Sequence, residues 1–205
     1  QEGGPHEVED ANLESNLTSL GYDVIWARGG INDTILADTD ALLISSIYEE
    51  TNNFTTDEIN AIAEWYNSGE KLLWVAGDSD YAGDTYINDN MTAILKSVGS
   101  HVYPEDTQIE DPGSNVNAAY CISSNITSNE RFVSPIVDGV NGALFHGPTC
   151  LYGCENGNDT SPVNLMDYSI PDVYPLLYYG PASYINDYDE IMPVAHDNGT
   201  SGPFV

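Results

Sequence analysis

The chain has 205 residues, of which 33 are Asp or Glu and only 4 are Lys or Arg, for a net charge of −29. That charge repels nucleic acid and anionic lipid at long range, so DNA, RNA and membrane surfaces are excluded as partners. No apolar run reaches the roughly 20 residues of a membrane-spanning helix, yet a hydrophobic content of 41% is enough to fill a folded core. Two explanations of the acidity stay open: a solvated surface like that of halophiles or acidophiles, and specific cation binding.

The first predicted element is a helix, because Leu13, Leu17 and Leu20 recur at helical spacing and Gly21 follows as a stop signal. The next segment, YDVIW at 22–26, predicts a strand.

Two apolar runs, ALLISS at 41–46 and KLLWVA at 71–76, predict strands buried on both faces because neither alternates with polar residues. Between them, Thr55 and Glu58 have the spacing of a capping box, which predicts a helix that starts there and ends at the Asn-Ser-Gly of 67–69.

The rest of the chain predicts one more helix and several short strands around a long loop. Apolar residues from 91 to 98 lie on one helical face, and residues 104–130 are rich in Asp, Asn, Ser and Gly, as in a long loop. The predicted strands are 101–103, 142–146, 174–179 and 190–195.

Alternating strands and helices predict an α/β fold with a three-layer, doubly wound, mainly parallel sheet. In it, 71–76 is central, 41–46 lies beside it, and Leu43 and Trp74 are buried. We expect one domain over 1–205, and a fragment of a longer polypeptide that is incomplete at both ends. The first ten residues cannot supply the buried strand that normally precedes the first helix.

Asn-x-Thr occurs seven times, never with Pro in the middle, and Asn-x-Ser does not occur. Because glycosyltransferases reach this motif outside the cytosol, its enrichment predicts an extracellular or cell-surface protein coated with N-linked glycans. The predicted glycosylation sites are Asn16, Asn32, Asn53, Asn90, Asn125, Asn158 and Asn198.

The three cysteines are Cys121, Cys150 and Cys154. In an oxidising compartment we expect one disulfide, with Cys150 and Cys154 as the candidate pair and Cys121 left over or paired with a missing segment. As a metal motif, Cys-x3-Cys is weak because no second pair accompanies it.

The densest acidic cluster lies in GDSDYAGDTYINDN, residues 77–90. Ca²⁺ takes six to eight oxygen ligands, which clustered Asp and Asn on a Gly-containing loop supply. The alternative is a solvated loop in which Asp78 or Asp89 caps a helix. The predicted calcium ligands are Asp78, Asp80, Asp84, Asn88 and Asp89.

A second acidic cluster contains Asp187, Asp189 and Glu190. It could complete a cation site, bridge to a neighbouring chain, or form a polar turn.

Ser79 and His146 are the candidate nucleophile and base of a hydrolase. The segment around Ser79 lacks the Gly-x-Ser-x-Gly pattern, and Asp on both sides disfavours an alkoxide. We therefore expect no catalytic residues.

The segments LGYDV, DALLISS and FTTDEINAIAEWYNSGEKLLWVAGDSD, followed later by ALFHGP, resemble the glutamine-amidotransferase-like superfamily, especially its non-catalytic ThuA-like and related branches. The resemblance implies that the doubly wound sheet is flavodoxin-like or amidotransferase-like. Active members carry a Cys nucleophile in the turn after the strand that matches 71–76, and this chain has Gly77, Asp78, Ser79 and Asp80 there. The resemblance therefore implies the fold without glutamine hydrolysis.

Together these patterns predict a non-catalytic structural or interaction domain of an exported archaeal envelope protein, in a surface layer or filament. We expect identical or other envelope subunits as partners and no direct membrane insertion of this segment. The alternatives are a secreted domain that binds a sugar or peptide, and a cryptic hydrolase.

Overall fold

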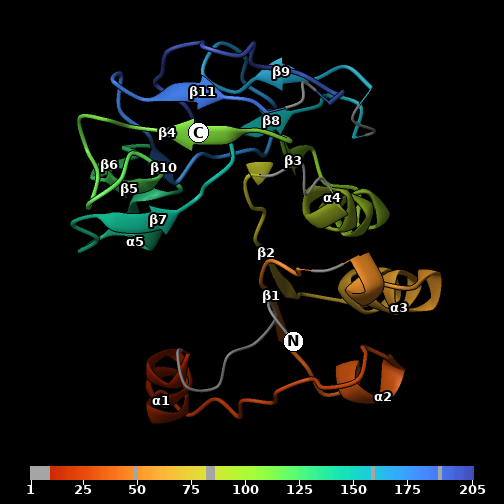
Figure 1. Ribbon diagram of the computed structural model, residues 1–205. Coiled ribbons are helices and arrows are strands. Elements are labelled where there is room, and N and C mark those ends of the chain that lie inside the picture. The colour runs from red at the N-terminus through yellow and green to blue at the C-terminus, as the bar shows by residue number, and fades with distance from the viewer. Residues whose placement is uncertain (1–9, 49, 82–85, 158–159, 189–190) are drawn as a thin grey trace. The chain divides into compact units, whose positions relative to one another are not determined.

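A computed structural model gives the fold (Figure 1). The chain divides into two compact units, Gln1–Ala76 and Gly77–Val205. The structure describes residues 10–48, 50–81, 86–157, 160–188 and 191–205.

The first unit contains one two-stranded sheet and three helices. Strands β1 and β2 pair in parallel, with Ala41 opposite Leu72, and α3 connects them and lies beside them (Figure 1). The predicted strand at 22–26 is wrong, because these residues have no strand partner. The elements are α1 (Ala11–Ser19), α2 (Asp33–Leu36), β1 (Ala41–Ile44), a 3-10 turn (Glu50–Asn52), α3 (Thr56–Asn67) and β2 (Leu72–Val75).

The capping box that the sequence predicts starts α3. Glu58 N–H donates to the Thr55 hydroxyl over 3.3 Å, and Thr55 N–H donates to the Glu58 carboxylate over 2.8 Å. The other oxygen of Glu58 accepts the Ile31 N–H at 3.0 Å. This close approach requires Gly30, since a Cβ there would lie 2.9 Å from Glu58 Oε1 and its φ of +110° suits glycine.

Partial burial raises the pKa of Glu58, but hydrogen bonds from the Thr55 backbone, the Thr55 hydroxyl and the Ile31 backbone outweigh it. The net pKa is therefore lowered.

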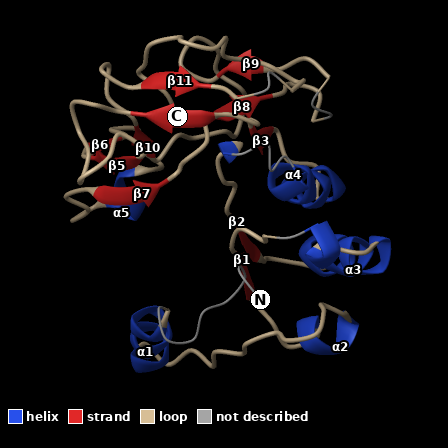
Figure 2. Cartoon of the chain, in the orientation of Figure 1, coloured by secondary structure: helices blue, strands red, loops and turns tan. Residues whose placement is uncertain are grey.

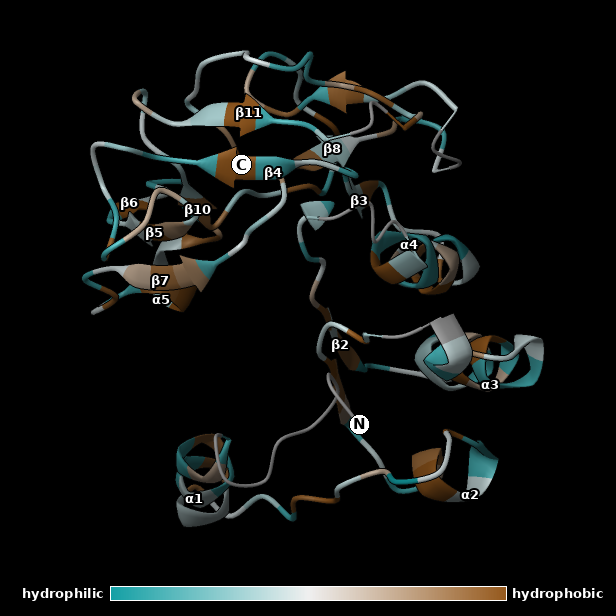
Figure 3. Cartoon of the chain, in the orientation of Figure 1, coloured by the Kyte–Doolittle hydropathy of each residue, from teal (hydrophilic) through white to brown (hydrophobic). Residues whose placement is uncertain are grey.

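The expected burial of both sheet faces is wrong. Leu43 and Trp74, which are paired in register, are 49% and 57% exposed. Both strands are strongly apolar (Figure 3), but a sheet of two strands has few neighbours to cover it. In the first unit, one face of this sheet presents Leu43, Leu72 and Trp74 to solvent.

The second unit is built from short antiparallel ladders (Figure 2). Its helices are α4 (Tyr86–Ser97) and α5 (Ser134–Val137), and its strands are β3 (Val102–Pro104), β4 (Gln108–Glu110), β5 (Cys121–Ser124), β6 (Ile126–Thr127), β7 (Ala143–His146), β8 (Leu151–Gly153), β9 (Val163–Asn164), β10 (Leu177–Tyr178) and β11 (Tyr184–Asn186). The ladders are β3-β8-β9, β4-β11, β5-β7 and β6-β10.

The predicted doubly wound, mainly parallel sheet is therefore wrong. The only parallel ladder among the described residues is β1-β2, and β3 pairs antiparallel with β8. Parallel neighbours need a crossover of a dozen or more residues, usually helical. Past β3, the one described helix is α5, which has four residues.

Residues 104–130, predicted as a long loop, contain β4, β5 and β6. Their Asn, Ser and Asp residues suggested a loop, but long-range pairing with β11, β7 and β10 makes them strands. The strands predicted at 101–103, 142–146 and 174–179 form in part or in full. Of the strand predicted at 190–195, the described residues 191–195 form none.

Replacing Glu58 with Ala should destabilise the first unit. The substitution removes the cap and the Ile31 hydrogen bond, which we expect to cost about 1–3 kcal/mol in unfolding free energy at pH 7. Trp fluorescence during urea denaturation reports this unit, because Trp26, Trp65 and Trp74 all lie in it.

Glu64→Ala is the matched control, since Glu64 is exposed on the same helix. A lowered pKa means that the stabilisation is present above the unfolded pKa of about 4.3 and is lost as the pH falls through the folded value. The difference between wild type and Glu58→Ala should therefore shrink below about pH 4.3, and a constant difference would contradict the proposed role of the carboxylate.

Candidate functional site

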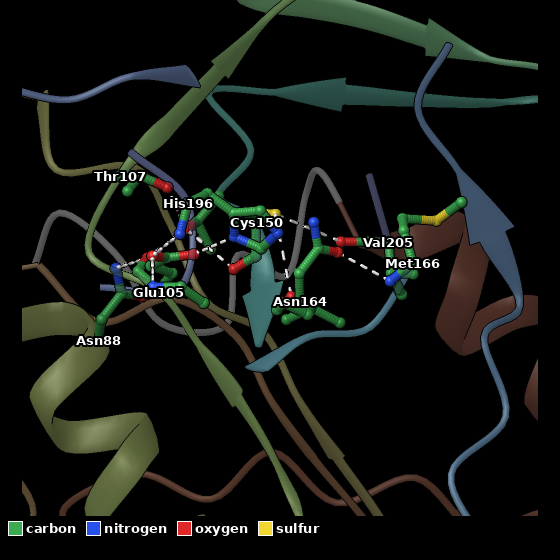
Figure 4. A network of polar contacts seen from close by, with 11 residues as sticks. Asn88, Glu105, Thr107, Cys150, Asn164, Met166, His196 and Val205 are labelled. Carbon is green, nitrogen blue, oxygen red and sulfur yellow. Dashed lines mark hydrogen bonds and ion pairs between the residues drawn. The ribbon is translucent and has the colours of Figure 1, made fainter. Parts of the chain in front are cut away.

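Glu105, Cys150 and His196 form a buried cluster in the second unit (Figure 4). One ligand-type atom from each side chain lies within 4.8 Å of the other two, and the residues are no more than 2% exposed. The sequence predicted Cys150 as a disulfide partner and as part of a weak Cys-x3-Cys metal motif, but it did not point to Glu105 or His196. Glu105, Cys150 and His196 are too far apart in the sequence to form a spacing motif. Only their residue types, which are common in metal and catalytic sites, could have indicated the cluster.

The register of the β3-β8 ladder places Glu105 beside Cys150. Pro104 is opposite Leu151, so the next pair along the ladder is Glu105 and Cys150. The Glu105 N–H donates to the Cys150 carbonyl over 2.8 Å. The Thr149 hydroxyl in turn donates to the Glu105 carbonyl, which fixes the backbone on both sides of the cluster.

The Glu105 carboxylate accepts three hydrogen bonds from a distant segment. One oxygen accepts the backbone N–H groups of Ala195 at 2.5 Å and His196 at 2.9 Å. The other accepts Nδ1–H of His196 at 2.5 Å. A buried charge is tolerated only when it is hydrogen-bonded in this way, so Glu105 holds the 195–196 segment in place.

The Glu105 bond orients the His196 ring. A proton on Nδ1 leaves Nε2 as the acceptor, and Nε2 lies 3.8 Å from the Cys150 sulfur. Phe204 packs edge-on against the ring with centroids 5.3 Å apart, which restricts its rotation. The imidazole therefore contacts both the carboxylate and the thiol, and the ligand atoms of the three side chains lie within 4.8 Å of one another (Figure 4).

The Cys150 thiol lies in apolar surroundings. Burial, and secondly the charge of Glu105, raise its pKa well above the ordinary value. Its sulfur is 3.9 Å from the carbonyl oxygens of Leu151 and Val205. The buried residues packed with it are Ile109, Ile122, Tyr179, Ile185 and Phe204.

The contacts from carboxylate to imidazole and from imidazole to thiol have the connectivity of an orienting acid, a base and a nucleophile. A nucleophile must also be a thiolate and be reached by its substrate. Cys150 is 0% exposed and its raised pKa favours the thiol, so this conformation suits a fixed polar network or a metal site better than a nucleophile.

The disulfide predicted between Cys150 and Cys154 does not form, and Cys121 is not in a disulfide either. The reason is that β8 extends between the two residues. Four residues of extended strand span about 13 Å, whereas the Cα atoms of a disulfide lie within about 7 Å.

The structure brings only part of the predicted calcium set together. Asp78, Asp80 and Asn88 lie at the start of the second unit, where Asn88 Oδ1 accepts the Asp78 N–H at 3.1 Å. Asp89 is exposed, in contrast to its buried neighbour Asn88, and Asp84 lies outside the described residues. Calcium binding by this loop stays a prediction.

Asn88 connects the acidic loop to the Glu105-Cys150-His196 cluster through hydrogen bonds. Its amide nitrogen donates to the carbonyls of Asp78 at 2.8 Å and Glu105 at 3.3 Å, and to the Asp106 carboxylate at 3.3 Å. These bonds give the buried amide a structural role.

Asp80 connects the first acidic segment to the second. Its carboxylate is buried and accepts the Tyr188 N–H at 2.8 Å, which brings Asp187 into the same region. Asp189 and Glu190 lie outside the described residues.

Ser79 and His146 do not form a hydrogen-bonded pair in the described part of the chain. Ser79 is buried and its N–H donates to the Gly147 carbonyl over 3.0 Å. His146 is exposed and packs edge-on against Tyr120 with centroids 5.4 Å apart.

Of the predicted glycosylation sites, Asn90 is 6% exposed and donates its amide to the Tyr86 carbonyl within α4, and Asn158 lies outside the described residues. Asn32 caps α2 through Oδ1, which leaves its nitrogen free for a glycan bond. The exposed sites are Asn16, Asn32, Asn53, Asn125 and Asn198.

A small pocket between α2 and α3 is lined by Leu36, Trp65 and Lys71, among others, and has a volume of about 160 Å³. Ligand pockets for small molecules are typically about 300–1,000 Å³. This pocket therefore does not support a ligand site.

No known protein family, curated relative or solved structure matches this chain. None of the described helices has the length and apolar character needed to cross a bilayer. The function must therefore be argued from the residues of the chain.

Replacing Glu105 with Ala should strongly destabilise the second unit. The substitution leaves two backbone N–H groups and one imidazole N–H without their acceptor, which we expect to cost about 3–5 kcal/mol. Glu130→Ala is the control, since Glu130 is exposed. Far-UV circular dichroism during denaturation measures both, and equal midpoints for the two variants would disprove the anchoring role of Glu105.

Thiol labelling should distinguish the cysteines. In the native chain with EDTA at neutral pH, maleimide should modify half-buried Cys121 before the buried Cys150 and Cys154, because Cys150 is inaccessible and its pKa is raised. Peptide mass mapping gives the order, and denaturant should make the three rates similar. Native labelling of Cys150 as fast as Cys121 would show that the site opens readily.

Proposed function

We propose that this chain is a non-catalytic structural or interaction domain of an extracellular, glycosylated cell-envelope protein, in a surface layer or surface filament. One observation carries the proposal: five of the seven Asn-x-Thr sites have exposed Asn side chains, distributed over both units. Glycans at these positions would leave the described cores unchanged. The partners are identical or other envelope subunits.

The charge of the chain supports the same proposal. With 33 acidic and 4 basic side chains, the surface needs hydration, salt or bound cations to limit its self-repulsion, and an extracellular ionic medium supplies them.

The two alternative functions have less support. The pocket between α2 and α3 is smaller than those of typical ligand-binding domains, so this pocket does not support that function. A hydrolase needs an accessible nucleophile, and the thiol of Cys150 and the side chain of Ser79 are both buried.

Glycopeptide mapping of native material tests the proposal. We expect glycans on Asn16, Asn32, Asn53, Asn125 and Asn198, and none on Asn90, whose side chain is buried in α4. Thr18→Val should lower the native mass by one glycan, whereas Thr92→Val, which removes the Asn90 site, should not change the glycan content.

Protease treatment of intact source cells tests the location in the same material. Release of these glycopeptides without cell lysis is the expected result. Unmodified Asn at all five exposed sites would contradict the proposal, as would release only after lysis.

A further inference from the structure

We propose that Cys150 and His196 bind a thiophilic d10 metal ion of the Zn²⁺ class, with Glu105 orienting the histidine through its Nδ1–H. The inference goes beyond the proposed surface function and does not depend on it. It rests on the residue types, the spacing of their donor atoms and their burial.

The spacing of the two ligand atoms fits a bridging ion. In a tetrahedral zinc site, Zn–S is about 2.3 Å and Zn–N about 2.0–2.1 Å, so the sulfur and nitrogen lie about 3.6 Å apart. Cys150 Sγ and His196 Nε2 are separated by 3.8 Å. A small adjustment of either side chain admits the ion between them.

Glu105 provides the hydrogen-bond acceptor that metal-binding histidines usually have. A metal-bound imidazole usually donates its other N–H to a carboxylate or carbonyl, which fixes the ring and makes it a better ligand. Glu105 Oε2 accepts Nδ1–H of His196 at 2.5 Å, and Nε2 faces the sulfur. Because both Glu105 oxygens already accept N–H groups, we assign Glu105 as a positioning residue.

The charge and donor chemistry favour this class of ion. Thiolate and imidazole are soft ligands that select Zn²⁺ or Cu(I) over Ca²⁺ and Mg²⁺. The ion would replace the thiol proton, which passes to solvent. Two positive charges would compensate the Cys150 thiolate and the buried Glu105 carboxylate. The Val205 carbonyl oxygen, 3.9 Å from the sulfur, would be available as an oxygen ligand.

Cobalt titration of the metal-free chain tests the site. Co²⁺ replaces Zn²⁺ and gives a thiolate-to-cobalt charge-transfer band in the near ultraviolet. Because 33 carboxylates would also bind cobalt weakly, the titration is done in high salt with excess Ca²⁺. We expect one equivalent of Co²⁺ to give the band, and one equivalent of Zn²⁺ to remove it.

Three variants assign the residues. Cys150→Ser should abolish the band, Cys121→Ser should keep it, and Glu105→Gln should keep it with about 10–100-fold weaker binding. Far-UV circular dichroism checks that each variant is folded. If Cys150→Ser does not fold, the wild-type chain still decides.

A folded wild-type chain that shows no charge-transfer band overturns the proposal. A band that persists in folded Cys150→Ser, or cobalt that excess Ca²⁺ displaces, also overturns it, because the ligands are then another cysteine or the carboxylates.

Discussion

The carboxylate of Glu105 lies where water does not reach it, and an ionised group in that position needs several hydrogen bonds to remain there. Its donors come from residues 195–196, about ninety positions along the chain. The requirement for these donors closes a long loop of chain onto the β3-β8 ladder. The Glu105 carboxylate thereby connects residues 195–196 to the β3-β8 ladder of the second unit.

The other contacts of the site follow from this bond. Once His196 is fixed by Glu105, its second nitrogen faces Cys150, and Phe204 packs against its ring. The terminal segment then joins the core ladders, since Tyr179 N–H donates to the Phe204 carbonyl over 2.9 Å and Leu151 N–H to Val205 over 3.1 Å. A metal ion between Cys150 and His196 would reinforce an arrangement that hydrogen bonds already define.

Local signals in the sequence predicted local structure. The capping box located α3, and the apolar runs located β1 and β2, because each depends on residues close in the chain. The ladders of the second unit could not be predicted in this way, since antiparallel register depends on long-range pairing. Glu105 also carried no signal among 33 acidic residues; only the fold distinguishes it, by burying it. The exposure of Leu43 and Trp74 shows the same limit, because an apolar strand does not reveal how many neighbours will cover it.

Amide hydrogen exchange at Ala195 and His196, followed by NMR in the metal-free native chain, tests the anchoring role of Glu105 most directly. These residues lie in a segment without regular secondary structure, so exchange at the rate of an exposed loop is the default expectation. If Glu105 organises the second unit, both amides will be protected nearly as well as the β3 and β8 amides, and will open with them. Rapid exchange of both amides while β3 and β8 remain protected would contradict the account.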